Sequence, residues 1–263
     1  MTDQTKTPDH QPDAAPVVQP VQQSQPSHLE RPLATPDAAQ WAPASSLGLA
    51  KRLVKWRGAA TVKPLRIGIY AGAFDPVHAG HIAFALQALE LAQLDEIVFL
   101  PERRPRAKPG VEHYAHRIAM LKKALRPHPM LSVMETVERN YSVTRTLPAL
   151  QQLFKGARLV MLIGSDVALC LAQWPHAAQL LKQTELVIGI RSQHQADELL
   201  TAIRDWPLRP LDLKIIDSYA PDISSSQIRL ALSADSTTKG LLSSVHRYAL
   251  QEWLYVSPGN IPS

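Results

Sequence analysis

Ten consecutive residues, Gly72 to His81, combine two histidines, two glycines and an aspartate in a short segment. The segment follows the apolar stretch 66–70, which predicts a buried strand, and it runs into residues that predict a helix. Unpaired backbone N–H groups at the start of such a helix, together with the helix dipole, favour an anion. His78 and His81 are three residues apart, so both side chains project from one side of the first turn. The pattern predicts a phosphate-binding site between the strand and the helix.

The glycines of this segment allow a ligand to lie close to the backbone. Gly72 permits a close approach at the end of the strand, and Gly80 permits one at the start of the helix. The segment resembles the signature G-x-F-D-P-x-H-x-G-H of the HxGH nucleotidylyltransferases, and every fixed position of that signature is present. Members of this superfamily join a nucleoside triphosphate to a phosphate acceptor and release pyrophosphate. The resemblance therefore implies an enzyme of nucleotidyl transfer.

The composition indicates a globular protein without a membrane-spanning segment. The 263 residues suffice for one α/β domain with additional segments, and 45% of them are apolar. No apolar run is long enough to cross a bilayer, and the N-terminus lacks the basic start and apolar core of a secretory signal. The single cysteine, Cys170, excludes an intramolecular disulfide. These features favour a cytoplasmic enzyme, and the formal net charge of +5 suits anionic ligands without indicating nucleic acid.

The chain divides into an extension, a domain and a tail. Prolines interleaved with polar residues over 1–62 predict a disordered extension, because such a segment buries too little apolar surface to offset the entropy of ordering. Within it, residues 46–57 predict a short basic amphipathic helix, either a docked linker or a helix that binds a membrane surface or a partner. Residues 63–257 form the expected nucleotidylyltransferase domain, and residues 258–263 form a tail.

From residue 66 onward, apolar strands alternate with helices. The expected strands are 66–70, 96–100, 131–134, 158–163, 186–190 and 213–217, and the expected helices are about 79–92, 114–125, 145–154, 176–182, 195–205, 225–232 and 244–254. The alternation predicts an α/β fold, a Rossmann-like doubly wound parallel sheet with helices on both faces. Ligands of such sheets bind beyond the carboxyl ends of the strands, so the motifs at these ends should converge on one site.

The strand 158–163 is followed by Gly164 and Asp166, which are well placed for a nucleotide. An aspartate just beyond a strand can accept hydrogen bonds from ribose hydroxyls, or it can cap the next helix. The spacing of Gly164, Asp166 and Trp174 resembles the nicotinate mononucleotide adenylyltransferases within the superfamily, where the matching tryptophan lies against the pyridine ring. Stacking of an electron-poor ring on indole explains that placement, and core packing is the alternative role for Trp174.

The segment from Ile223 to Arg229 resembles the I-S-S-T-x-I-R motif of the same family. Its serines supply hydroxyls at a helix start, where they cap the helix or donate to phosphate. Arg229 lies on the first turns of that helix and can form a fork with a polyphosphate. The end of the chain resembles the family's closing V-x-x-Y-I…L-Y segment. We assign the matching residues to packing, namely Val245, Tyr248, Leu254 and Tyr255.

The loop 101–109 is basic and corresponds to the family's P-P-H-K or P-P-H-R loop. Pro105 and Lys108 match the ends of that motif, whereas Arg106 and Ala107 do not. Basic side chains at the edge where ligands bind predict a phosphate clamp, with an ordinary solvated loop as the alternative. Two further segments resemble the family: the H-R-x-x-M of His116, Arg117 and Met120, whose arginine is mainly structural, and 140–147, which has one residue more than the family's S-Y-T-x-x-T-L.

Taken together, the resemblance implies adenylyl transfer from ATP to nicotinate or nicotinamide mononucleotide, giving the dinucleotide and pyrophosphate in the biosynthesis of NAD. The implied catalytic residues are His78, His81, Lys108 and Arg229. The implied ATP-binding residues are Gly72, Ala73, Phe74, Gly80, Gly164, Asp166, Ile223, Ser224, Ser225 and Ser226. The implied mononucleotide-binding residues are Asp75, Tyr141, Ser142, Thr144, Trp174 and Arg191.

Mg²⁺ is the expected cofactor, because it bridges phosphate oxygens while keeping most of its waters and so needs no full set of protein ligands. The pairs His78/His81 and His113/His116 raise the alternative of zinc, but no cysteine or H-E-x-x-H pattern supports it.

Two other functions stay open. One is an HxGH transferase that uses CTP or a phosphopantetheine-type acceptor. The other is a nucleotide-binding regulator without turnover, whose basic segment 51–66 contacts an acidic partner. Small-molecule substrates are the expected partners, without nucleic acid or a membrane span, and assembly into a homo-oligomer is left open.

Overall fold

The computed structural model describes residues 63–106, 108, 110–217, 220, 222–234 and 236–256. The expected disordered extension over 1–62, its basic helix at 46–57 and the tail 258–263 lie outside the described residues. Among the helices of the described ranges, none has the length and apolar character that crossing a membrane requires.

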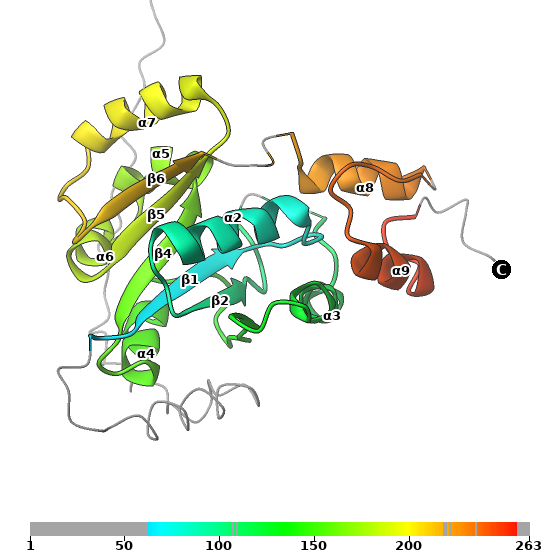
Figure 1. Ribbon diagram of the computed structural model, residues 1–263, viewed down its shortest axis with the longest axis horizontal. Helices are drawn as coiled ribbons and strands as arrows, with labels where there is room; N and C mark the ends of the chain where they lie inside the picture. The colour runs from blue at the N-terminus through cyan, green and yellow to red at the C-terminus, as the bar shows by residue number, and fades with distance from the viewer. Residues whose placement is uncertain are drawn as a thin grey trace, which may run out of the picture. The chain divides into compact units, whose positions relative to one another are not determined.

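Six parallel strands form one sheet in the order β3-β2-β1-β4-β5-β6 (Figure 1). The strands are β1 (Arg66–Gly72), β2 (Glu96–Pro101), β3 (Leu131–Val133), β4 (Arg158–Gly164), β5 (Glu185–Ile190) and β6 (Leu213–Asp217). The order reverses between β1 and β4, as it does in the Rossmann-like doubly wound fold. The predicted fold class is therefore confirmed.

Helices connect the strands, and each predicted helix occurs with its ends displaced by a few residues at most. They are α2 (Ala79–Leu91), α3 (Tyr114–Leu125), α4 (Thr146–Leu153), α5 (Ser165–Leu169), α6 (Ala177–Gln183), α7 (Gln193–Arg204), α8 (Ser225–Ser233) and α9 (Ser243–Gln251), with a 3₁₀ turn, η2 (Leu171–Gln173). The sequence pattern does not predict α5 and η2, because they are too short for a helical period to show.

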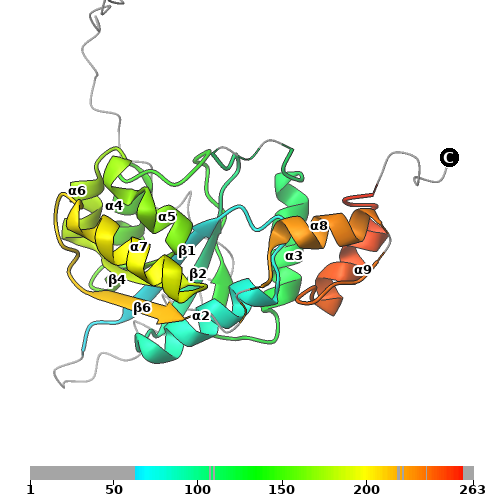
Figure 2. The same ribbon diagram turned by 90° about the horizontal axis from the view of Figure 1, so that it is seen from above.

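Both faces of the sheet are buried, as its nearly continuous apolar strands require. On one face, Phe99 and Leu162 pack with buried side chains of α2, α3, α8 and α9. On the other face, Val98 and Met161 pack with buried side chains of α4, α6 and α7. Both ribbon views show α8 and α9 beside α3, on the opposite side of the sheet's centre from α6 and α7 (Figures 1 and 2). Successive side chains along each strand thus point alternately into two apolar layers.

The register of the strands places their carboxyl ends at a common edge. Gly72 at the end of β1 lies opposite Pro101 at the end of β2. Gly164 at the end of β4 lies opposite Gly189 near the end of β5. The loops that follow these strands must therefore meet beyond this edge, on either side of the switch point between β1 and β4.

Candidate active site

A cavity of about 510 Å³ opens beyond the carboxyl ends of the strands, and its volume is in the range of small-molecule sites. The segments after β1, β2, β4, β5 and β6 all contribute to its lining. Every residue predicted to be catalytic or to bind ATP lines this cavity, and so do Asp75 and Arg191. The motifs that are separated along the sequence are therefore brought together at one place.

His78 and His81 hold each other at the start of α2. The backbone N–H of His81 donates to His78 Nδ1 over 3.3 Å, and that of His78 donates to His81 Nδ1 over 3.2 Å. The two rings are stacked, with their centroids 3.7 Å apart. His78 is the N-cap of the helix, and the pair forms a reciprocal capping box. The signature thus fixes both rings through the helix start itself.

Both imidazoles are neutral near pH 7 and share one tautomer. Because each Nδ1 accepts a hydrogen bond, the ring proton of the neutral form is on Nε2. Burial, together with the charge of Arg191, lowers the pKa of His78 to about 4. Burial and the neighbouring positive groups also hold the pKa of His81 well below its ordinary value. The two Nε2–H groups are therefore neutral donors suited to phosphate oxygens in the cavity that they line.

The buried histidines predict a loss of stability in acid. The unfolded chain binds a proton on His78 near pH 6.5 and the folded protein only near pH 4, so the free energy of unfolding falls as the pH drops through this window. His78 alone should account for on the order of 3 kcal/mol of that fall. Urea unfolding at neutral and acidic pH should show a smaller fall for His78→Asn, whose amide oxygen can still cap the helix. Equal falls in the two proteins would contradict the neutral, buried assignment.

Gly80 lines the cavity and also lies against the ring of His78. A Cβ on Gly80 would lie 3.0 Å from His78 Nδ1 and 3.1 Å from His78 Cε1. Gly72 is covered in a similar way, because a Cβ there would lie 3.2 Å from the Phe74 ring. At both glycines the structure shows a close approach to side chains that build the site, and the expected approach to a ligand stays a prediction.

Among the described residues of the basic loop after β2, Lys108 is the cation that lines the cavity, and its side chain is exposed. Two arginines of the same loop are bound to other partners. Arg103 Nε donates to the carbonyl of Thr136 over 2.6 Å. Arg106 Nη2 donates to the carbonyl of Tyr141 over 3.3 Å. Arg103 and Arg106 therefore anchor the loop, and Lys108 is the phosphate-binding candidate that lies in the cavity lining.

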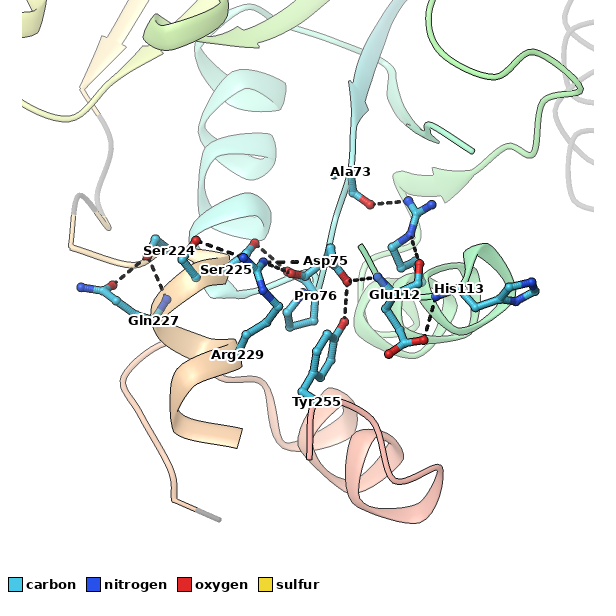
Figure 3. A network of polar contacts seen from close by, with 12 residues as sticks. Ala73, Asp75, Pro76, Glu112, His113, Ser224, Ser225, Gln227, Arg229 and Tyr255 are labelled. Atoms are coloured by element: carbon cyan, nitrogen blue, oxygen red, sulfur yellow. Dashed lines mark hydrogen bonds and ion pairs between the residues drawn. The ribbon is translucent and has the colours of Figure 1, made fainter. Parts of the chain in front are cut away.

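The first turn of α8 faces the cavity and is tied to the signature segment. Ser224 is the N-cap, and its Oγ accepts from the N–H of Gln227 over 3.3 Å. Ser225 Oγ donates to the carbonyl of Pro76 over 3.0 Å (Figure 3). The structure therefore shows the capping role of this serine-rich segment, and the Ser225 bond fixes α8 beside the start of α2.

Arg229 brings a positive charge from α8 to the cavity. Its Nη1 donates to the carbonyl of Asp75 over 2.7 Å, and its Nη2 donates to Ser226 Oγ over 3.2 Å. Nη1 also lies 3.8 Å from Asp75 Oδ2. The side chain keeps 38% of its surface exposed, so the guanidinium is positioned while part of it stays open to a ligand.

Asp166 and Arg191 bring opposite charges to the ends of β4 and β5. A Cβ on Gly164 would lie 2.5 Å from Asp166 Oδ1, so the aspartate folds back over the glycine. Arg191 follows β5 directly, and its charge contributes to the lowered pKa values of both His78 and His81. The carboxylate suits ribose hydroxyls, and the guanidinium suits a phosphate.

Tyr70 also lines the cavity, although no sequence motif indicates it. Its ring packs edge-on against Phe74 and Phe84, with centroids 5.2 Å and 5.5 Å away. Burial and the Asp166 charge raise the pKa of Tyr70, which keeps it a neutral phenol. Strand parity could have found it, because Tyr70 and Gly72 lie two residues apart on β1 and share a face of the sheet.

The residues predicted to bind the mononucleotide fall into two groups. Asp75 and Arg191 line the cavity. The other four lie outside its lining, namely Tyr141, Ser142, Thr144 and Trp174. Tyr141 is buried, and its ring centroid lies 6.5 Å from that of Trp174. Ser142 Oγ and Thr144 Oγ1 are 3.2 Å apart. The Tyr141 hydroxyl is buried without a hydrogen-bond partner among the described residues. Tyr141 and Trp174 thus form an aromatic pair beside the sheet, and their binding roles stay predictions.

Within the described ranges, no group of three or more His, Cys, Asp or Glu side chains could hold a metal ion. In the second histidine pair, His116 Nδ1 is 3.0 Å from the Tyr248 hydroxyl of α9.

Comparisons with known proteins agree with this geometry. Residues 69–231 match the family described as Cytidylyltransferase-like. A probable nicotinate-nucleotide adenylyltransferase of Solibacter usitatus (strain Ellin6076) is 30% identical over 198 residues, which cover 73% of this chain and 100% of that protein. A protein of the same description from Neisseria meningitidis serogroup C is 29% identical over 197 residues, which cover 72% of this chain and 98% of that protein.

A solved structure shares the fold. The Plasmodium falciparum nicotinic acid mononucleotide adenylyltransferase complexed with NaAD superposes with a TM-score of 0.62 at 19% identity, covering 73% of this chain and 97% of that chain. The family match spans more than half of the chain, so the protein is a nucleotidylyltransferase that belongs to the Cytidylyltransferase-like family. Within that class, the two relatives named above are described as probable nicotinate-nucleotide adenylyltransferases.

Proposed function

We propose that the protein transfers the adenylyl group of ATP to nicotinate mononucleotide, releasing pyrophosphate, as a cytoplasmic step in the biosynthesis of NAD. The observation that carries this proposal is the convergence of neutral His78 and His81 with the cations Lys108 and Arg229 on one cavity at the switch point of the sheet. Relatives that match along nearly their whole length carry the description of this activity.

The reaction requires alignment of two anions more than it requires a base. The phosphate of the mononucleotide is already ionised near neutral pH, so it can attack the α-phosphorus of ATP without a strong general base. The new P–O bond forms as the bond from the α-phosphorus to the bridging oxygen of the leaving pyrophosphate breaks. His78 and His81 donate Nε2–H to phosphate oxygens, and Lys108 and Arg229 neutralise the leaving pyrophosphate. A Mg²⁺ ion bound together with ATP would supply further positive charge to the polyphosphate, beside Lys108 and Arg229.

A direct assay tests the proposed reaction and separates its rivals. Purified protein is incubated with Mg²⁺, ATP and either nicotinate or nicotinamide mononucleotide, and the products are separated by chromatography. We expect the dinucleotide and pyrophosphate, with the nicotinate substrate preferred and with no product when CTP replaces ATP. Product formed from CTP, or in a parallel incubation with phosphopantetheine in place of the mononucleotide, would indicate another HxGH transferase. Binding of ATP without any turnover would indicate a regulator.

The aromatic pair of Tyr141 and Trp174 leads to a prediction about Trp174. If the pyridine ring stacks on its indole, Trp174→Ala should raise KM for the mononucleotide several-fold to tens-fold, since stacking contributes about 0.5–1.5 kcal/mol beyond burial. KM for ATP should change much less, and Trp174→Phe should recover part of the loss. The buried, unpartnered hydroxyl of Tyr141 beside it supports a ligand there, because buried hydroxyls usually have a partner.

The control for this prediction is Trp206, which is 7% exposed and lies in the same apolar cluster. Trp206→Ala should lower the melting temperature and leave the ratio of the two KM values unchanged. If Trp174→Ala behaves like Trp206→Ala, with equal effects on both substrates, Trp174 is a packing residue and the stacking role is wrong.

A further inference from the structure

The end of the described chain reaches the signature segment. Tyr255, which follows α9, donates its hydroxyl to Asp75 Oδ1 over 2.7 Å (Figure 3). Tyr255 is expected to be a packing residue, and its ring does pack against the apolar cluster that contains Val245 and Leu254. Packing does not explain the hydroxyl, which bonds to a residue that lines the cavity. The assignment of Tyr255 to packing alone is therefore wrong.

The two oxygens of the Asp75 carboxylate have different surroundings. The side chain is buried, and Oδ1 accepts both the Tyr255 hydroxyl and the N–H of Glu112, the latter over 3.2 Å. Oδ2 is buried and accepts no hydrogen bond from the described residues. It lies 3.8 Å from Arg229 Nη1, which is longer than a hydrogen bond. One oxygen is thus fixed, and the other faces the cation of the site without binding it closely.

This asymmetry matters because a free carboxylate would bind the arginine. Aspartate and arginine readily form two parallel N–H···O bonds, and such a fork would occupy the donors that a phosphate needs. Fixing Oδ1 removes that option, because both oxygens would have to turn toward the guanidinium. Arg229 is instead held through the Asp75 carbonyl and through Ser226 Oγ. Its charge therefore remains available to a phosphate.

The backbone at both ends of the Tyr255–Asp75 bond is held in an uncommon conformation. Tyr255 has φ +64°, and Phe74, which precedes Asp75, has φ +49°. Bulky residues rarely adopt this left-handed region, and such strain persists only where the surroundings enforce it. Burial, reinforced by the Asp75 charge, raises the pKa of the Tyr255 hydroxyl, so it remains protonated and donates at neutral pH.

We propose that Tyr255 is a positioning residue of the active site, which keeps Arg229 available to the triphosphate by fixing the Asp75 carboxylate through Oδ1. This role rests on the proposed function, because it requires a nucleoside triphosphate in the cavity. Through this role, the segment that follows α9 contributes to the active site.

Tyr255→Phe tests the role, since it keeps the ring and removes the hydroxyl. We expect kcat/KM for ATP to fall on the order of 10-fold, the Kd for Mg²⁺-ATP in calorimetric titration to rise, and KM for the mononucleotide to stay nearly unchanged. The melting temperature should stay close to that of the wild type. The matched control is Tyr248→Phe on α9, which removes the bond to His116 Nδ1 outside the cavity and should leave ATP binding and turnover unaltered.

A double-mutant cycle shows whether Tyr255 acts through Arg229. In an Arg229→Met background, Tyr255→Phe should have no further effect on kcat/KM for ATP, because the guanidinium that Tyr255 keeps available is absent. Additive losses would overturn the proposal, and so would a Tyr255→Phe protein with wild-type ATP parameters. Wild-type protein that neither bound ATP nor formed dinucleotide would overturn the proposed function together with this role. Wild-type turnover that Tyr255→Phe leaves intact would overturn the positioning role alone.

Discussion

Replacing Arg117 with methionine will lower the free energy of unfolding by about 3–5 kcal/mol. Arg117 is 0% exposed, and its guanidinium donates to backbone carbonyls of Glu112, Ala73, Glu102 and Arg103 over 2.7–3.1 Å. Burial lowers the pKa of Arg117, and the nearby Asp75 carboxylate opposes that shift. Without the guanidinium, these carbonyls lose their donors in the interior, which makes the substitution costly.

Urea unfolding at neutral pH measures this effect. The matched control is Arg126→Met at the end of the same helix, where the side chain is exposed and the expected change is within about 0.5 kcal/mol. Because Arg117 joins the loops after β1 and β2, the variant should also lose activity under conditions where it is still folded. Equal stability of the two variants would show that the Arg117 contacts add little to the fold.

Replacing His81 with alanine will lower kcat/KM by on the order of 10²-fold or more, because a contact to charge that develops in the transition state is lost. The motivation is the neutral Nε2–H donor that the reciprocal His78–His81 hydrogen bonds direct to the cavity. His81→Asn serves as a second variant, since its amide oxygen can still accept the His78 N–H and keep the helix start.

The matched control is His113→Ala in the second histidine pair, whose side chain is exposed and lies outside the cavity lining. We expect that variant to keep wild-type kinetics. Circular dichroism and thermal unfolding establish that each variant is folded. Near-normal turnover by folded His81→Ala protein would remove His81 from the catalytic assignment.

The fold could be predicted because its determinants are local and repeated. Apolar runs such as 66–70 and 186–190 alternate with amphipathic segments, and this alternation favours a parallel sheet that helices cover on both faces. The helix α5 and the turn η2 escaped prediction because a few residues show no period. Their structure depends on packing at the end of β4, which no local pattern reports.

Much of the site could also be predicted, since a parallel sheet brings the loops after its strands to one edge. For that reason, His78, Asp166 and Arg229 line the same cavity although they lie far apart in the sequence. What escaped prediction depends on contacts between distant residues. The Tyr255–Asp75 bond spans 180 positions of the chain, and the tight contact at Gly80 is with a neighbouring side chain. Contacts of this kind cannot be recognised from the spacing of residues in the sequence or from its composition.

The most direct test of adenylyl transfer follows the phosphorus atoms of ATP. Wild-type protein is incubated with Mg²⁺, nicotinate mononucleotide and ATP labelled either at the α-phosphorus or at the γ-phosphorus, and the products are separated. Adenylyl transfer predicts that the α-label appears in the dinucleotide only when the mononucleotide is present, and that the γ-label appears in pyrophosphate. Release of the γ-label as orthophosphate, or formation of labelled AMP without the mononucleotide, would contradict it.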